Sequence, residues 1–130
     1  MRPPRIYETV LYASDVPAAA RFYREVLGLR LVDGPDDLAA AFRLDDGGML
    51  LLFDPALSSQ PGRPVPSHGA TGAGHVAFSV ASLDGWREHL AEHGVEVEQE
   101  KEWPRDGRSI YVRDPAGNSV ELVEGDLWPP

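Results

Sequence analysis

The 130-residue sequence contains no cysteine, which excludes disulfide bonds, thiolate metal ligands and cysteine nucleophiles. No apolar run is long enough to cross a bilayer, and the opening MRPPR lacks the apolar core of a signal peptide. Basic residues are scarce, because 12 lysines and arginines stand against 21 aspartates and glutamates, for a net charge of −9. A chain this acidic repels phosphate backbones and anionic lipid. We therefore expect a soluble, cytoplasmic protein without nucleic-acid or membrane partners.

The residues that are present are typical of a single globular domain over residues 1–130, with 42% hydrophobic and 25% charged residues. Residues 6–12 are rich in aromatic and β-branched side chains, which predicts a strand. Helical spacing of apolar residues follows over 16–27, and Gly28 is placed to end that helix. Three further strands are predicted at 29–32, 39–44 and 49–53, which gives the order β-α-β-β-β.

The same order returns after a segment rich in proline, glycine and serine, which is typical of a linker. Ser82 is expected to cap the second helix, and Glu8 and His75 hold equivalent places in the two halves. The pattern indicates a two-fold repeat, with module one over about 6–54, a linker at 55–73 and module two over about 74–124. The strands of module two are predicted at 74–80, 95–97, 109–113 and 119–123.

Alternation of side chains along each strand decides which residues share a face of the sheet. Val76 and Val120 are expected to face the helix of module two, so that His75 and Glu121 face the other way. Glu8 takes the corresponding place in module one. Each module has one helix to cover its sheet, so the second face either meets solvent or curls around a cavity.

Two carboxylates and a histidine in such a cavity would be costly unless they were paired, protonated or bound to a metal ion. A divalent ion offsets both negative charges, while neutral imidazole donates a lone pair. The pattern alone favours the ordinary interpretation, because three polar residues can share a face by chance. A glutamate on a strand commonly faces water, and a histidine is commonly held by hydrogen bonds.

The sequence resembles the vicinal oxygen chelate superfamily, which includes glyoxalase I, extradiol dioxygenases, methylmalonyl-CoA epimerase, and fosfomycin- and bleomycin-resistance proteins. The resemblance is carried by three segments between Tyr7 and Glu124: ETVLYASDVPAAARFYREVLGLRLV, GHVAFSV and GRSIYVRDPAGNSVELVE. It implies an α+β fold of two tandem β-α-β-β-β modules forming a curled mixed sheet around a cavity. It also implies pairing of modules, which we expect to occur in a homodimer.

In that superfamily up to four metal ligands lie on the cavity-facing strands, two from each module. By resemblance, Glu8 takes the first position, His75 matches the histidine of the GH-x-A-F strand, and Glu121 closes the DPxGNxxEL motif. The fourth position falls on Leu51 or Leu52, and neither side chain binds a metal. The resemblance therefore implies one divalent ion per site (Zn, Ni, Co, Mn or Fe) with open positions for substrate oxygens. In a homodimer, Glu8 would come from one chain and the other two ligands from its partner.

The function that follows from this resemblance is a metal-dependent lyase or isomerase of the glyoxalase type, acting on a small molecule that chelates the ion through vicinal oxygens. Glu121 and Glu8 are then the expected catalytic bases. Tyr12, Tyr111 and Arg113 share the face of the ligands and are expected to bind substrate. An ion pair between Arg113 and a neighbouring acidic residue is at least as consistent with the sequence.

Three alternatives from the same superfamily stay open. A metal-free protein of the bleomycin-resistance kind would sequester an antibiotic, and the acidity of this chain suits a cationic ligand. A fosfomycin-type resistance transferase would use three ligands at these positions, but with histidine in place of Glu8. Extradiol dioxygenases have a site with two histidines and one carboxylate, whereas the first ligand position here is Glu8. Glyoxalase I itself has a carboxylate at the position that is leucine here.

Three other features are expected to have ordinary structural roles. His68 lies in a glycine-rich loop and is expected to be solvated. Trp103 is expected to pack under a loop rather than over a substrate. The alternating glutamates between residues 96 and 102 predict a charged, solvated edge of the sheet.

Overall fold

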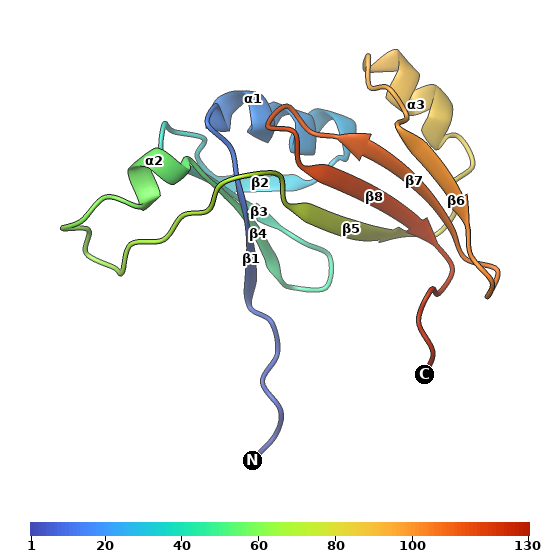
Figure 1. Cartoon of the computed structure of the whole chain (residues 1–130), viewed down its shortest axis with the longest axis horizontal. Helices are drawn as coiled ribbons and strands as arrows, with labels where there is room; N and C mark the ends of the chain where they lie inside the picture. Colours follow the sequence, from blue (N-terminus) through green and yellow to red (C-terminus); the bar gives the residue numbers. More distant parts are fainter. The chain divides into compact units, whose positions relative to one another are not determined.

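The computed structural model describes residues 1–130, which divide into two compact units, Met1–Gly72 (unit 1) and Ala73–Pro130 (unit 2). Each unit holds one four-stranded sheet, with the strand order β1-β4-β3-β2 in unit 1 and β5-β8-β7-β6 in unit 2 (Figure 1). The first strand of each unit runs parallel to its neighbour, and the remaining pairs are antiparallel. The predicted α+β fold with two β-α-β-β-β modules is confirmed.

Unit 1 begins with β1 (Glu8–Tyr12) and α1 (Val16–Arg21), which continues into the π-helical segment η1 (Phe22–Val26). The Asp15 carboxylate caps α1 by accepting a hydrogen bond from the Ala18 N–H at 3.0 Å. Gly28 follows with a φ of 71°, a conformation that glycine adopts without strain. The remaining strands are β2 (Arg30–Asp33), β3 (Ala39–Arg43) and β4 (Met49–Phe53).

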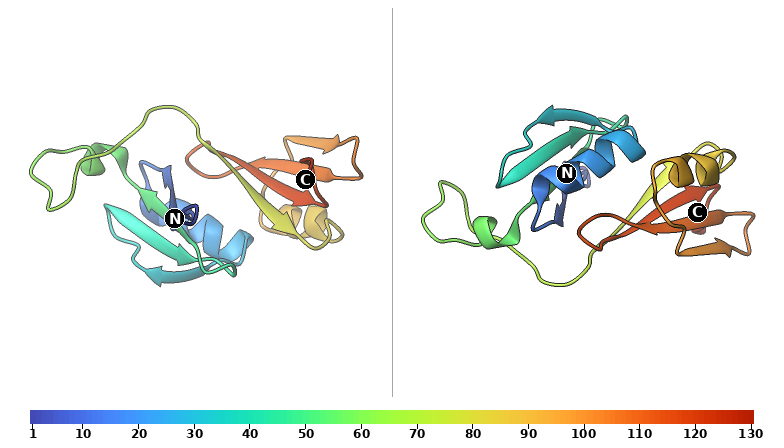
Figure 2. Two further views of the ribbon diagram at one scale, coloured as in Figure 1. Left: turned by 90° about the horizontal axis from the view of Figure 1, so that it is seen from below. Right: turned by 90° about the horizontal axis from the view of Figure 1, so that it is seen from above.

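Unit 2 contains β5 (His75–Val80), α3 (Trp86–Glu92), β6 (Gln99–Glu102), β7 (Arg108–Arg113) and β8 (Ser119–Glu124). In Figure 2 the helices α1 and α3 each lie beside the sheet of their own unit. The turn between β7 and β8 is held by Asp114, whose carboxylate accepts hydrogen bonds from the Ala116 and Asn118 N–H groups. The Asn118 side chain in turn accepts a hydrogen bond from the Gly74 N–H, which fixes the start of β5.

The structure corrects the expected strand at 95–97, because backbone pairing in this segment begins later. The Val95 N–H donates to the Leu90 carbonyl at 2.8 Å and so closes the end of α3. Glu98 is the first residue to bond to β7, through the Tyr111 carbonyl. The edge strand is therefore β6, and all four of its residues are exposed as expected.

Two further expectations are corrected at helix starts. The residue that caps α3 is Gly85, with a φ of 83°, whereas the Ser82 hydroxyl accepts a local hydrogen bond from the Asp84 N–H. The segment expected to be a plain linker contains the short helix α2 (Pro55–Ser58). Asp54 caps α2 by accepting a hydrogen bond from the Ala56 N–H at 2.8 Å.

The core of each unit lies on the helix-facing side of its sheet. In unit 1, Tyr23 of η1 packs against Phe42 of β3, with ring centroids 6.1 Å apart, and both side chains are fully buried. In unit 2, Leu90 of α3 is buried, as are the inward-facing residues of β7 and β8: Ile110, Val112, Val120 and Leu122. None of the helices has the length and apolar character required to span a bilayer.

Glu124 at the end of β8 gives a prediction about acid sensitivity. Its carboxylate accepts hydrogen bonds from the Leu83 N–H and from Arg108, and these lower the pKa of Glu124 below its ordinary value of 4.5. A carboxyl group with a lowered pKa stabilises the folded state above pH 4.5, and that stabilisation is lost as the pH falls through the folded-state pKa. Glu124→Gln should therefore lower the melting temperature at pH 7. The difference from wild type should shrink below pH 4.5 in thermal unfolding. Glu92→Gln, at an exposed position of α3, is the control and should show no such pH-dependent difference.

Candidate functional site

Polar side chains gather on the face of the unit 2 sheet that lies opposite the core. Strand pairing places Glu121 of β8 between Ala77 of β5 and Tyr111 of β7. His75 of β5 pairs with Ser119 of β8, and these two residues lie two positions before Ala77 and Glu121 on their strands. Because side chains alternate along a strand, these residues share one face, as the sequence predicts.

His75 and Glu121 approach each other closely on this face. The distance between His75 Nε2 and Glu121 Oε1 is 3.3 Å. The histidine side chain is 50% exposed, whereas the glutamate side chain is only 7% exposed. On its other side, His75 Nδ1 lies 3.2 Å from the Ser119 carbonyl oxygen and 3.1 Å from the Ser119 hydroxyl. The imidazole is therefore held through both nitrogens, with one of them directed at a nearly buried carboxylate.

The second oxygen of Glu121 is occupied by a residue that the sequence analysis did not assign to the site. Ser109 of β7 donates a hydrogen bond from its hydroxyl to Glu121 Oε2 at 2.5 Å, and Ser109 is itself 1% exposed. The alternation that assigns Tyr111 to this face also assigns Ser109 to it, so the signal was present in the sequence. It did not reveal the contact, because Ser109 lies diagonally from Glu121 in the strand register.

Tyr111 of β7 lies beside His75 and Glu121 on the same face of the sheet. Its ring stacks on the His75 ring, with centroids 6.4 Å apart and an interplanar angle of 25°. Burial raises the pKa of the Tyr111 phenol above its usual value. The negative charge of Glu121 and a hydrogen bond to that carboxylate raise the pKa further, against a smaller lowering by Ser109. The phenol therefore keeps its proton at neutral pH and acts as a hydrogen-bond donor here.

Arg113 lies on the same face but is engaged in an ion pair. Its Nε and Nη2 atoms donate to the two carboxylate oxygens of Glu98, at 2.8 and 3.2 Å. Its Nη1 atom donates to the Gly117 carbonyl at 3.0 Å. Both side chains of the pair are about half exposed. The acidic partner is Glu98 and not the adjacent Asp114, which holds the β7–β8 turn.

Glu8 lies in unit 1, at the exposed first position of β1. The strand register also shows which leucine of unit 1 corresponds to Glu121 of unit 2. Val10 comes two residues after Glu8 and pairs with Leu51, just as Ala77 comes two residues after His75 and pairs with Glu121. Leu51 therefore holds the place of Glu121 in unit 1, and Leu52 points into the core with no exposed surface.

Tyr12 and His68 form a pair on the same face of unit 1 as Glu8, which corrects the expectation that His68 is solvated. Their Oη and Nδ1 atoms are 2.8 Å apart, and the His68 ring meets Phe53 edge-on with centroids 4.7 Å apart. Ser58 bonds to the backbone of His68 in both directions. Contacts with β1, β4 and α2 therefore hold this loop residue against the sheet.

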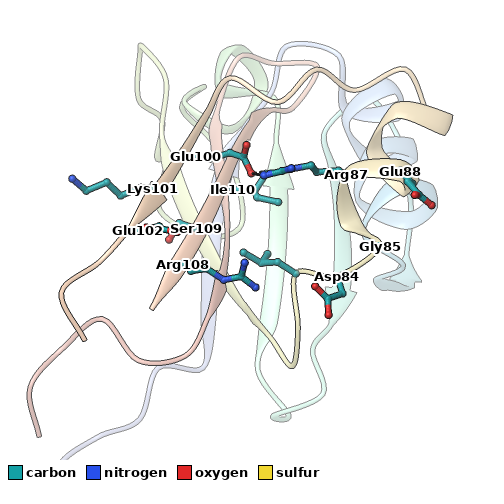
Figure 3. Close-up of a pocket in the computed structure, with 11 residues that line it drawn as sticks. Asp84, Gly85, Arg87, Glu88, Glu100, Lys101, Glu102, Arg108, Ser109 and Ile110 are labelled. Carbon is teal, nitrogen blue, oxygen red and sulfur yellow. Dashed lines mark hydrogen bonds and ion pairs between the residues drawn. The ribbon is translucent and has the colours of Figure 1, made fainter. Parts of the chain in front are cut away.

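A separate cavity of about 500 Å³ lies between α3 and the strands β6 and β7 of unit 2 (Figure 3). Ile110 contributes to its lining, so the cavity is on the helix-facing side of β7. Its walls carry charges of both signs, and Arg87 of α3 forms an ion pair with Glu100 of β6 across it. The cavity contains neither His75 nor Glu121, although Ser109, the hydrogen-bond donor to Glu121, is among the residues that line it.

Comparison with known proteins places the chain in a family. A model described as the Glyoxalase/Bleomycin resistance protein/Dioxygenase superfamily matches residues 5–122. The chain belongs to this superfamily. The membership confirms the resemblance drawn from the sequence motifs, and it covers both units.

Individual members of the superfamily carry different names. The chain is 43% identical to a protein whose crystal structure is described as lactoylglutathione lyase from Agrobacterium tumefaciens, over 100% of both chains and with a TM-score of 0.91. It is 27% identical to "Lactoylglutathione lyase" of Haemophilus influenzae, covering 92% of each. It is 34% identical over 109 residues to "Putative ring-cleaving dioxygenase MhqE" of Bacillus subtilis, but spans only 35% of that protein's length.

Metal ions are typical of this superfamily, and the side chains of the candidate site include groups that can bind one. In neither unit do three or more histidine, aspartate or glutamate side chains come together as a metal-binding group. Unit 2 nevertheless brings one imidazole nitrogen and one carboxylate oxygen to 3.3 Å, a separation compatible with two ligands of a single ion. This donor pair fits a divalent metal such as zinc, nickel, cobalt, manganese or iron.

Proposed function

We propose that this chain is a metal-dependent enzyme of the glyoxalase type, a lyase or isomerase that acts on a small molecule with two vicinal oxygens. The observation that carries the proposal is the 3.3 Å approach of His75 Nε2 to Glu121 Oε1 on the polar face of unit 2. A nearly buried carboxylate facing an imidazole needs a proton or a cation between the two groups. The relatives named lactoylglutathione lyase support the choice of reaction class.

His75, Glu121 and Glu8 are the residues that would hold the ion. Leu51 at the fourth position adds no ligand, which leaves coordination positions for substrate oxygens. Once bound, the ion would act as a Lewis acid that stabilises negative charge on a substrate oxygen. Because Glu8 belongs to unit 1, the full set requires one unit 1 and one unit 2. In the homodimer that we propose, Glu8 comes from one copy, and His75 and Glu121 come from the other.

The proton transfer is assigned to a carboxylate. In the proposed step a C–H bond next to a substrate carbonyl breaks, the proton passes to Glu121 and the electron pair moves onto the carbonyl oxygen. Glu121 then returns the proton to the former carbonyl carbon, while the hydroxyl group on the first carbon becomes a carbonyl and its proton passes to the former carbonyl oxygen. The isomerisation is therefore balanced without a further reactant. Glu8, exposed at the start of β1, is the second candidate base. Tyr111 would donate a hydrogen bond from its phenol to a substrate oxygen beside this carboxylate.

Two further residues are proposed to bind the substrate. Arg113 would exchange its ion pair with Glu98 for a substrate carboxylate, since a guanidinium group matches either partner in the same bidentate way. Tyr12, held by His68, would present its ring beside the substrate.

A set of one histidine and two carboxylates differs from the two histidines and one carboxylate typical of iron oxygenases. The donor set thus supports a lyase or isomerase over a ring-cleaving dioxygenase.

A metal-free binding protein is the second candidate, and one observation favours it. Part of the face of unit 1 that carries Glu8 is apolar and aromatic, with Leu51, Phe53 and the Tyr12–His68 pair, while the strand register places Arg30, Asp33 and Arg43 on the same face. Such a surface suits an aromatic ligand, and the net charge of −9 suits a cationic one.

Metal analysis decides between the two candidates. Protein purified without chelator should contain one divalent ion per chain by elemental analysis. Stripping the ion should abolish turnover of lactoylglutathione, the first compound to test, and adding back Zn²⁺, Ni²⁺ or Mn²⁺ should restore it. A wild-type protein that is empty and takes up none of these ions would contradict the enzyme proposal and favour the binding protein.

A further inference from the structure

The hairpin between β6 and β7 directs an indole group toward the candidate site. Trp103 follows directly after β6. Its backbone N–H donates a hydrogen bond to the Gly107 carbonyl at 2.8 Å, which closes the hairpin. The Lys101 ammonium lies 5.3 Å from the centre of the indole ring. From this half-buried position, Trp103 Nε1 donates a hydrogen bond to the Ser109 hydroxyl at 2.9 Å.

The direction of the next hydrogen bond follows from the chemistry of the groups. An indole N–H can only donate, so the Ser109 oxygen accepts from Trp103. The single hydroxyl proton of Ser109 is then available for Glu121 Oε2, which lies 2.5 Å away. The three residues form a chain of donors, Trp103 to Ser109 to Glu121, that ends on the carboxylate.

Burial makes this chain effective. Ser109 is 1% exposed and Glu121 is 5% exposed, so water has little access to replace the hydroxyl as donor. With Oε2 held by Ser109, Oε1 is the oxygen left to face His75. The carboxylate is thereby fixed in one rotation rather than free to turn.

We infer that Trp103 and Ser109 are positioning residues that orient the Glu121 carboxylate toward His75 for metal binding. The inference rests on the proposed function in that Glu121 is taken as a ligand. A second observation within the same chain supports it. The register places Ala39 of unit 1 opposite Phe53, as Ser109 of unit 2 is opposite Val123. Unit 1 therefore has Ala39 in place of the hydroxyl and Leu51 in place of the carboxylate, so donor and acceptor are present together in unit 2 and absent together in unit 1.

The first test uses metal-free protein and the three tryptophans of the chain, Trp86, Trp103 and Trp128. In a ¹H–¹⁵N spectrum the indole signal of Trp103 should move in Glu121→Gln, through Ser109, while those of Trp86 and Trp128 stay in place. In Ser109→Ala the Trp103 indole proton should also exchange faster with solvent. An unmoved Trp103 signal in Glu121→Gln would overturn the inference, whether or not the protein binds a metal.

The second test measures Zn²⁺ affinity by calorimetry. Loss of an outer partner of a metal ligand commonly weakens binding by about 10- to 100-fold, and we expect this range for Ser109→Ala. Trp103→Phe, which keeps an aromatic ring but removes the N–H, should weaken binding by roughly two- to tenfold. Because Trp103 acts through Ser109, Trp103→Phe should have no further effect in the Ser109→Ala background. Additive losses would indicate a structural role for Trp103 and overturn its part in the inference.

Matched controls separate this inference from the proposed function. Ser79→Ala, on the same face of β5, and Trp128→Phe, near the C-terminus, should leave Zn²⁺ affinity unchanged. Wild-type protein that binds Zn²⁺ with an affinity unaffected by Ser109→Ala would contradict the inference alone. Wild-type protein that binds none of Zn²⁺, Ni²⁺ and Mn²⁺ would contradict the proposed function, and with it the metal role assigned to Trp103 and Ser109.

Discussion

Glu121→Ala is expected to abolish retention of the divalent ion and to lower turnover by at least about 100-fold, since a general base alone commonly contributes that much. The alanine removes a metal-binding oxygen and the proposed base in one change. It also leaves the Ser109 hydroxyl without its acceptor and His75 without the carboxylate that it faces. Elemental analysis and a steady-state assay on the same preparation would measure both effects.

The matched control for this prediction is Glu102→Ala, at an exposed position of the edge strand β6. It changes the net charge by the same amount without touching the candidate site, so its metal content and turnover should equal those of wild type. If Glu121→Ala retained a full complement of metal while remaining folded, Glu121 would not be a ligand. The His75–Glu121 contact would then be an ordinary hydrogen-bonded pair.

The faces of the sheets could be predicted from the sequence because alternation along a strand is a local property. His75, Glu121 and Tyr111 lie together on the polar face of unit 2 as their parity indicates. The strand expected at 95–97 was wrong for a reason that parity does not include. Val95 completes the end of α3 through its N–H, and this hydrogen bond competes with strand pairing.

Contacts made by side chains from distant segments were not predictable in this way. His68 lies in a segment whose composition indicates an open loop, yet it bonds to Tyr12, 56 residues earlier in the chain. Trp103 was expected to pack under a loop, and its actual partner depends on how the β6–β7 hairpin closes. Both cases need the three-dimensional path of the chain, which no local pattern carries.

The choice between Leu51 and Leu52 required the strand register, and it leads to the second large expected effect. Leu52 has no exposed surface, so Leu52→Ala should lower the free energy of unfolding by about 2–5 kcal/mol. Leu51 is partly exposed on the opposite face, so Leu51→Ala should cost about 1 kcal/mol or less. Urea unfolding of the two variants measures the difference directly.

Glutamate substitutions extend the same comparison to the site. Leu52→Glu would bury an unpaired carboxylate and should prevent folding of unit 1. Leu51→Glu should fold, because the side chain at position 51 is partly exposed on the opposite face. Equal costs at the two positions would show that the register of β4 is wrong, and Leu51 would lose its equivalence to Glu121. A folded Leu51→Glu variant would instead carry a carboxylate on the same face of unit 1 as Glu8. Leucine at this position would then not be a requirement of the fold.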